Sequence, residues 1–134
     1  MSAAHGDRVL VDTHVVLWAL TAPEKLGASA RETLRAGSTQ VLYSSVTTTE
    51  LAVKLALGKL ILPVPLAELV AGLFREEGFT GLPYTHEHAL ELGRLPPHHR
   101  DPFDRMLIAQ ARVEGVPLVT ADRVLHRYDV PILW

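Results

Sequence analysis

The sequence predicts an α/β fold in which helices cover both faces of a central, mostly parallel sheet. Short runs of branched apolar residues alternate with helical patterns along the chain, glycine or proline separates many of the segments, and acidic residues follow the apolar runs. Alternating strands and helices form βαβ units, which build a parallel sheet between two helical layers. The carboxyl ends of such strands share one edge, where ligands usually bind.

The chain begins with a predicted arm, a strand and a helix. Residues 1–7 are small and polar without a periodic pattern, so we expect a flexible arm. The branched run at residues 8–12 predicts a buried strand that ends on Asp12. From His14 the chain is apolar nearly all round, which predicts an internal helix that stops before Pro23.

The later elements are predicted from caps and breakers. In the first half these are a helix over residues 29–37, capped by Ser29 with Glu32 as the acid of a capping box, a strand over 40–43, and a helix from Ser44 or Ser45 to Gly58. In the second half they are a helix over 66–76, a brief strand within 78–83, a helix over 86–93 capped by Thr85, a helix from Asp101 and Pro102 to Gly115, a strand over 116–120, a helical turn over 122–126, and an extended segment over 130–134.

Length and composition narrow the class of protein. The 134 residues predict one domain over 8–134, and the lack of cysteine excludes disulfide frameworks and thiolate metal sites. A net charge of -2 means that any binding to nucleic acid must come from a local basic patch. No apolar run is long enough to span a membrane, so we expect a soluble, cytoplasmic protein.

Acidic residues from distant parts of the chain map to the ligand-binding edge of the predicted sheet. They are Asp12, Glu50, Asp104 and Asp122. Carboxylates brought together in this way repel one another unless a cation compensates them, and Mg²⁺ or Mn²⁺ prefers such oxygen ligands. The chemistry predicted from this cluster is metal-assisted hydrolysis of a nucleic-acid backbone.

Each acid also has a purely structural interpretation. Asp12 or Asp101 caps a helix, Asp104 adds negative charge near a helix N-terminus, Glu50 forms a surface ion pair with Lys54, and Asp122 is a turn residue. Considered singly, each acid favours this interpretation. Considered together, their coincidence at one edge favours a metal site.

Several segments resemble the PIN-domain ribonucleases, specifically the VapC-type toxins. The matching segments are VDTHVVLWAL at 11–20, residues 44–54 around Glu50, LPPHHRDPFDRMLIAQA at 95–111, LVTAD at 118–122 and the closing ILW at 132–134. They follow the order of the family over nearly the whole chain. The segment DPFDR with its following helix is the most distinctive of them.

This resemblance implies a PIN-like three-layer fold and a magnesium-dependent endoribonuclease that acts on single-stranded or structured RNA. It also implies a homodimer that is inhibited by a VapB-type antitoxin encoded beside it. The acidic set of the family then falls on Asp12 and Asp104 as direct metal ligands, with Glu50 positioning or deprotonating the attacking water and Asp122 completing the site. Asp101 is expected to organise the site as a helix cap more than to bind metal.

Other polar residues are assigned supporting roles at the same edge. The hydroxyls of Thr13, Ser44 and Thr120 are predicted to donate either to the carboxylates or phosphate or to local caps. The predicted RNA-phosphate contacts are Arg100, Arg105 and Lys54. A zinc site built from the histidines at 86, 88, 98 and 99 is disfavoured, because adjacent rings rarely converge on one tetrahedral ion.

Two other classes of function stay open at this point. The first is a phosphatase in which Asp12 attacks phosphorus, although His14 stands where such enzymes place a second acid. The second is a catalytically inactive PIN-like module that only binds RNA or protein. A covalent phospho-aspartate would distinguish the phosphatase, and cleavage that depends on metal and on the acids would exclude the inactive module.

Overall fold

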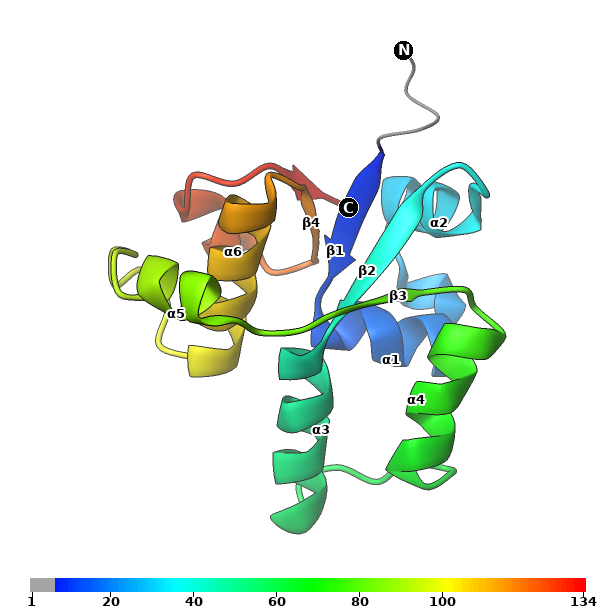
Figure 1. Ribbon diagram of the computed structural model, residues 1–134. Helices are drawn as coiled ribbons and strands as arrows, with labels where there is room; N and C mark the ends of the chain where they lie inside the picture. The colour runs from blue at the N-terminus through cyan, green and yellow to red at the C-terminus, as the bar shows by residue number, and fades with distance from the viewer. Residues whose placement is uncertain (1–6) are drawn as a thin grey trace.

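The computed structural model describes residues 7–134, so most of the predicted arm at residues 1–7 lies outside the described residues. The centre is a five-stranded sheet of order β3-β2-β1-β4-β5, in which every neighbouring pair is parallel (Figure 1). Its strands are β1 (Arg8–Val11), β2 (Gln40–Ser44), β3 (Thr80–Leu82), β4 (Leu118–Val119) and β5 (Ile132–Leu133). The predicted α/β class and parallel sheet are confirmed.

Six α-helices and two short 3-10 helices connect the strands. They are α1 (Thr13–Thr21), η2 (Pro23–Lys25), α2 (Ala28–Arg35), α3 (Ser45–Ala56), α4 (Leu66–Arg75), α5 (His86–Leu92), α6 (Pro102–Glu114) and η3 (Arg123–Arg127). Only η2 has no counterpart among the predicted elements. Over residues 7–134, the structure contains no helix with the length and apolarity required to cross a membrane.

The strands divide their side chains between two cores, which gives the three layers predicted. Val9 and Val11 of β1 join a cluster with α1, α2 and α4, whereas Leu10 joins a cluster with α6 on the other face. This alternation is the period of two that a β-strand imposes on its side chains. Because both faces are covered by helices, the central strands are apolar on both sides.

The register of the sheet brings the ends of β1 and β4 to the same level. Val11 lies opposite Val119, and the main-chain N–H of Asp12 donates to the carbonyl of Val119 at 3.1 Å. The residues that follow these two strands, Asp12 and Thr120, therefore lie next to each other. This edge of the sheet carries the candidate site described below.

Helix α1 differs from the prediction of an internal helix. Val15 and Val16 are buried, but Leu17 and Trp18 are half-buried and Leu20 is 39% exposed. His14 also points to solvent instead of into a core. The apolar pattern of α1 predicts complete burial. One side of the helix instead faces an open groove beside α4.

The capping box predicted at Ser29 and Glu32 is wrong. Helix α2 begins at Ala28, its N-cap is Gly27, and no side chain caps it. Instead, the main-chain N–H of Ala30 donates to the main-chain oxygen of Trp134 at 3.0 Å. The N-terminus of α2 is thus satisfied by a residue more than 100 positions away, where local sequence predicts a serine cap.

Gly27 is therefore expected to be intolerant of a side chain. A Cβ added there would lie 2.1 Å from the Trp134 main-chain oxygen and 2.7 Å from its ring atom Cδ1. We expect Gly27→Ala to lower the free energy of unfolding by about 1–3 kcal/mol through overpacking, measured by urea denaturation. Gly37→Ala is the matched control, because a Cβ at Gly37 meets nothing within 4 Å. Equal stabilities of the two variants would contradict this packing.

Candidate active site

The candidate site lies where β1 and β4 end and where α1, α6 and η3 begin. Three aspartates in this region are N-cap residues: Asp12 caps α1, Asp101 caps α6 and Asp122 caps η3. A carboxylate is favourable at a helix N-terminus because it accepts hydrogen bonds from otherwise unpaired N–H groups and meets the positive end of the helix dipole. Local capping chemistry places these side chains at helix starts, and the parallel order of the strands brings those starts to one edge of the sheet.

Asp12 is the most deeply buried of the capping aspartates, with 5% of its surface exposed. Its Oδ1 accepts from the N–H of Val15 at 2.9 Å, and the Thr120 side chain is also hydrogen-bonded to it. Burial raises the pKa of Asp12 above its usual range, although these hydrogen bonds oppose the rise. Thr120 also accepts from the main-chain N–H of Asp122, so it links two of the acids.

Glu50 projects from α3 and is 2% exposed. The hydroxyl of Thr13 donates to its Oε1 at 2.7 Å, and the ammonium of Lys54 contacts its Oε2 at 2.5 Å. The Glu50–Lys54 pair is therefore not the surface ion pair of the structural interpretation, since its carboxylate is buried. The hydrogen bond to Glu50 raises the pKa of Lys54, and the charges of Asp101 and Asp104 add to this effect.

Asp104 lies in the first turn of α6. The pKa of its carboxyl is raised to about 7, chiefly by burial and next by the neighbouring charge of Asp101. Asp12 and Glu50 contribute smaller increases, whereas His99 lowers the pKa. Asp101 itself accepts from the N–H groups of Phe103 and Asp104 at 2.8 and 3.4 Å, which is the capping role expected of it.

His99 is the site residue that sequence reasoning missed. Its Nε2 lies 3.0 Å from Oδ2 of Asp122 and 3.3 Å from Oδ2 of Asp104. Ligand-capable atoms of His99, Asp104 and Asp122 all lie within 4.8 Å of one another, and within residues 7–134 this is the one such group of three or more. The sequence feature that could have identified His99 is its position two residues before the Asp101 cap, which puts both residues in the same turn of the chain.

The structure thus brings the predicted acids into one region, but the distances between them are not all equally short. Asp104 and Asp122 belong to the 4.8 Å group, whereas Asp12 and Glu50 lie outside it. Both of these nevertheless lie near enough to raise the pKa of Asp104. Asp12 and Glu50 are buried, whereas Asp104 and Asp122 are partly exposed to solvent.

The predicted supporting residues divide into two groups. Thr13 and Thr120 contact Glu50 and Asp12 respectively, whereas Ser44 caps α3 and donates to Oε1 of Gln110 at 2.5 Å. Among the predicted RNA contacts, Arg100 is exposed, Lys54 pairs with Glu50, and the guanidinium of Arg105 donates to the Leu95 carbonyl at 3.2 Å. Ser44 and Arg105 therefore hold the fold around the site.

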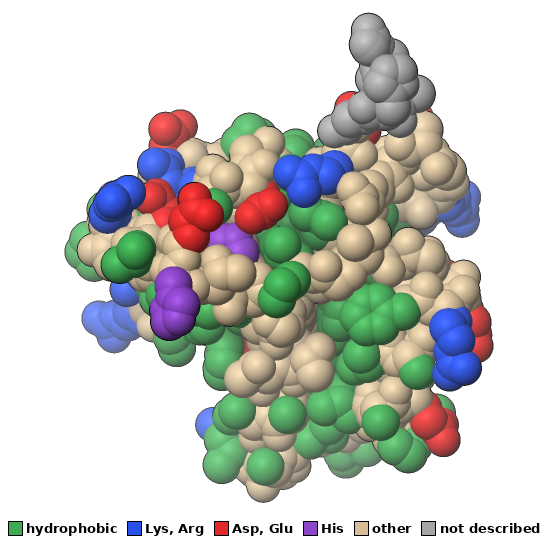
Figure 2. Space-filling view, viewed as in Figure 1, with side chains coloured by type: hydrophobic (Ala, Val, Ile, Leu, Met, Phe, Trp, Pro, Cys, Tyr) green, Lys and Arg blue, Asp and Glu red, His purple; other side chains and the backbone are tan. Residues whose placement is uncertain are grey.

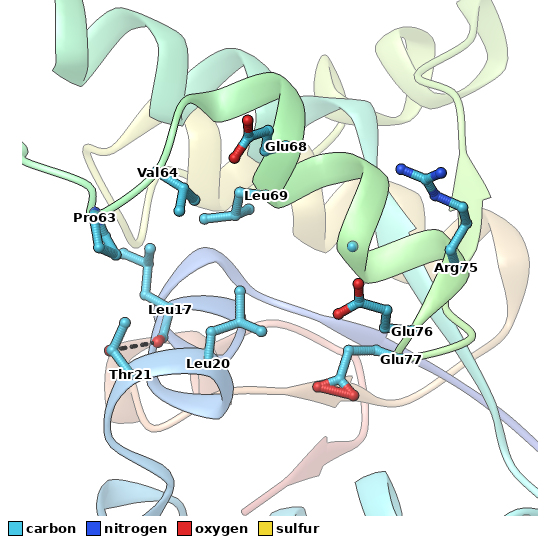
Figure 3. Close-up of a pocket in the computed structure, with 11 residues that line it drawn as sticks. Leu17, Leu20, Thr21, Pro63, Val64, Glu68, Leu69, Arg75, Glu76 and Glu77 are labelled. Carbon is cyan, nitrogen blue, oxygen red and sulfur yellow. Dashed lines mark hydrogen bonds between the residues drawn. The ribbon is translucent and has the colours of Figure 1, made fainter.

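A second feature is an apolar groove between α1 and α4, with a volume of about 430 Å³ (Figure 3). Leu17, Leu20, Val64 and Leu69 line it, and charged residues of α4 and its end stand at its rim. Hydrophobic side chains also gather on the surface over α3 and α4 (Figure 2). Ile61, between these helices, is 93% exposed, which leaves a large apolar area open to solvent.

Comparison with known proteins agrees with this architecture. The chain is similar to a chain in the crystal structure of VapBC2 from Rickettsia felis bound to a DNA fragment from their promoter, with a TM-score of 0.71, 14% identity, and coverage of 93% of this chain and 96% of that one. It is also similar to a chain of DNA-bound VapBC from Salmonella typhimurium, with a TM-score of 0.67, 22% identity, and coverage of 94% and 96%.

A third similar structure is VapBC-5 from Mycobacterium tuberculosis, a member of the VapBC family of toxin-antitoxin systems, with a TM-score of 0.60, 20% identity, and coverage of 93% and 96%. No curated protein matches the chain. At these identities the structural likeness shows the fold. The family match is direct and spans residues 9–131, so the chain belongs to the PIN domain family.

Proposed function

We propose that the protein is a magnesium-dependent endoribonuclease and the toxin of a type II toxin–antitoxin pair. The observation that carries this proposal is the grouping of Asp104 and Asp122, whose carboxylate oxygens lie within 4.8 Å of each other. Burial and other acids of the site also raise the pKa of the Asp104 carboxyl to about 7. A group of this kind binds a divalent cation favourably, because the cation offsets both the lost hydration and the repulsion. The PIN domain family and the similar VapBC structures support the same proposal.

The donor set fits a hard cation. The oxygens of Asp12, Asp104 and Asp122 are the carboxylate ligands that Mg²⁺ or Mn²⁺ prefers. Asp12 and Asp104 would hold the ion and Asp122 would complete the site. When bound, the ion would lower the pKa of a water and neutralise charge on the scissile phosphodiester.

The remaining residues act on the water and on the RNA. Glu50 is fixed by Thr13 and Lys54, which suits it to orient the attacking water and accept its proton. Arg100 is exposed beside the Asp101 cap and is placed to contact RNA phosphates. Lys54 is half-buried beside the acids, so its ammonium also reduces the repulsion between the acidic site and a polyanionic substrate.

The geometry disfavours Asp12 as a phosphatase nucleophile. Its carboxylate is 5% exposed, and one oxygen accepts from the N–H of Val15. A nucleophilic carboxylate must reach phosphorus with a free oxygen in line with the leaving group. The inactive-module alternative is distinguished by the activity measurements below.

The partners proposed are a VapB-type antitoxin and a second copy of the chain. The groove between α1 and α4 offers the antitoxin an apolar site with a charged rim (Figure 3). The exposed apolar residues Leu57 and Ile61 are what a second copy would cover in a homodimer. Both surfaces lie on α1, α3, α4 and their connections, away from the His99 loop.

Cleavage of labelled single-stranded RNA in the presence of Mg²⁺ tests the proposed activity. We expect Asp12→Asn, Asp104→Asn, or addition of EDTA to lower the cleavage rate by about 100-fold or more, since each removes a ligand or the ion itself. Asp129→Asn is the matched control, because the Asp129 side chain is fully exposed and pairs with Arg112, outside the acidic cluster. Equal rates in all samples would contradict metal-dependent catalysis.

The raised pKa of Asp104 predicts a pH-dependent stability of the metal-free protein. Its carboxyl has a pKa of about 7 in the folded chain and an ordinary value of 3.8, so the folded chain binds the proton more tightly. The resulting stabilisation is present at low pH and is lost as the pH rises toward 7. The metal-free wild type should therefore melt lower than Asp104→Asn at pH 8, on the order of 5 °C, and this difference should shrink as the pH falls toward 3.8.

Mg²⁺ provides the control for this comparison of melting temperatures. Added Mg²⁺ should raise the melting temperature of the wild type at pH 8 and leave that of Asp104→Asn unchanged. A difference between the two proteins that does not vary with pH would contradict the assignment to the Asp104 carboxyl.

A charge in the apolar groove tests the proposed antitoxin site. We expect Leu20→Glu to weaken binding of the antitoxin encoded beside this chain by about tenfold or more, measured by calorimetry, because a carboxylate would be buried without a partner. RNA cleavage should be unaffected. Leu90→Glu on α5 is the control, since Leu90 is 69% exposed and lies outside the groove. Equal affinities of both variants would exclude the groove as the antitoxin site.

A further inference from the structure

The ring of His99 joins two helix N-termini at the candidate active site. Its Nδ1 accepts from the main-chain N–H of Asp101, the cap of α6, at 3.0 Å. Its Nε2 is hydrogen-bonded to Oδ2 of Asp122, the cap of η3, at 3.0 Å and lies 3.3 Å from Oδ2 of Asp104. The main-chain N–H of His99 also donates to the Tyr128 hydroxyl at 2.9 Å, which fixes the loop that carries the ring.

These contacts determine which ring nitrogen carries the proton. A main-chain N–H can only donate, so Nδ1 must present its lone pair to Asp101. In the neutral ring the proton is then on Nε2, where it points to Oδ2 of Asp122, which accepts it when that carboxyl is ionised. A nitrogen that carries a proton has no lone pair for a metal ion. His99 is therefore a hydrogen-bond donor in this arrangement, although it lies within ligand distance of two acids.

The Nε2–H of His99 stands between two carboxylates of like charge. Asp122 accepts at both oxygens, from the N–H of Val124 at Oδ1 and from His99 at Oδ2. Two basic side chains of the region have other partners: Arg105 donates to the Leu95 carbonyl, and Lys54 pairs with Glu50. The ring thus holds Asp122 beside Asp104 through its Nε2–H.

We infer that His99 is a positioning residue that preorganises Asp104 and Asp122 for the metal ion through its Nε2–H and is not itself a ligand. The inference rests on the proposed metal-dependent function. Hydrogen-bonded partners of ligating groups fix the orientation of those groups, and their loss commonly weakens metal binding about 10–100-fold. The inference adds to the acids a residue that no part of the acidic pattern predicts.

Two substitutions separate the two halves of the ring. Asn places an oxygen acceptor near the position of Nδ1 and lacks the Nε2 donor, whereas Gln places an amide donor near the position of Nε2 and lacks the Nδ1 acceptor. We expect His99→Asn to weaken Mn²⁺ binding about 10–100-fold by calorimetry, and His99→Gln to bind Mn²⁺ within about threefold of wild type. His86→Asn and His86→Gln, at an exposed histidine of α5, are the controls.

The variants give results that either support or overturn the inference. Wild-type affinity of His99→Asn, or an equal loss in His99→Gln, would overturn it, because the Nε2 donor would then not be the contributing group. If His99→Asn or His99→Gln does not fold, nitrogen-15 NMR of the wild type decides instead. The expected spectrum has a protonated Nε2 and an unprotonated Nδ1 in His99, both without metal and with saturating Mg²⁺.

A proton on Nδ1, or loss of the Nε2 proton when Mg²⁺ is added, would overturn the inference, since the ring would then be oriented differently or act as a ligand. Failure of the proposed function gives a different result. In that case the wild type and Asp104→Asn would show the same Mn²⁺ binding, whatever the state of the His99 ring.

Discussion

The structure around the site depends on carboxylates that accept hydrogen bonds from helix N-termini. Asp12, Asp101 and Asp122 each accept from main-chain N–H groups at the start of α1, α6 or η3. In a parallel sheet these helix starts meet at the edge where the strands end. The same interactions that begin three helices therefore concentrate negative charge at one place, and the site is a consequence of how the fold is built.

This concentration of charge is unfavourable in the metal-free protein. Burial raises the pKa of Asp12 and that of Asp104, because a desolvated carboxylate is poorly stabilised when ionised. The chain compensates in two ways that differ in kind. Lys54 supplies a full positive charge to the buried Glu50, whereas His99 supplies a hydrogen-bond donor to Asp122 beside Asp104. The carboxylates of Asp104 and Asp122 are where a cation is proposed to bind.

Much of this fold could be predicted because its signals are local. The Asp101 cap, Pro102 at the first helical position and the left-handed Gly115 that ends α6 are all read from neighbouring residues. The positions of Asp12 and Asp122 follow from strands whose apolar runs are short and distinct. The convergence of the acids on one edge then requires only the parallel order of the strands.

The features that were missed arise from contacts between distant residues. The N-terminus of α2 is satisfied by Trp134, so its local serine had no capping role to fill. The open side of α1 depends on where α4 packs, which the apolar pattern of α1 does not contain. His99 resembles any loop histidine in the sequence, and its role is visible only once the N-termini of α6 and η3 meet.

The capping aspartates also explain why stability and activity can be separated at this site. Asn retains the side-chain oxygen that accepts from a helix N–H, so an Asp-to-Asn change preserves the cap while it removes the charge. At Asp104, which is not a cap, burial and the neighbouring acids disfavour the charge in the metal-free fold, and the nearby His99 offsets only part of this effect. A catalytic role at such a site requires buried carboxylates that lower the stability of the folded chain. This conflict between stability and activity is common where catalytic residues are buried together. In the proposed function a bound cation would relieve this conflict, so that the metal would contribute to the stability of the protein as well as to its chemistry.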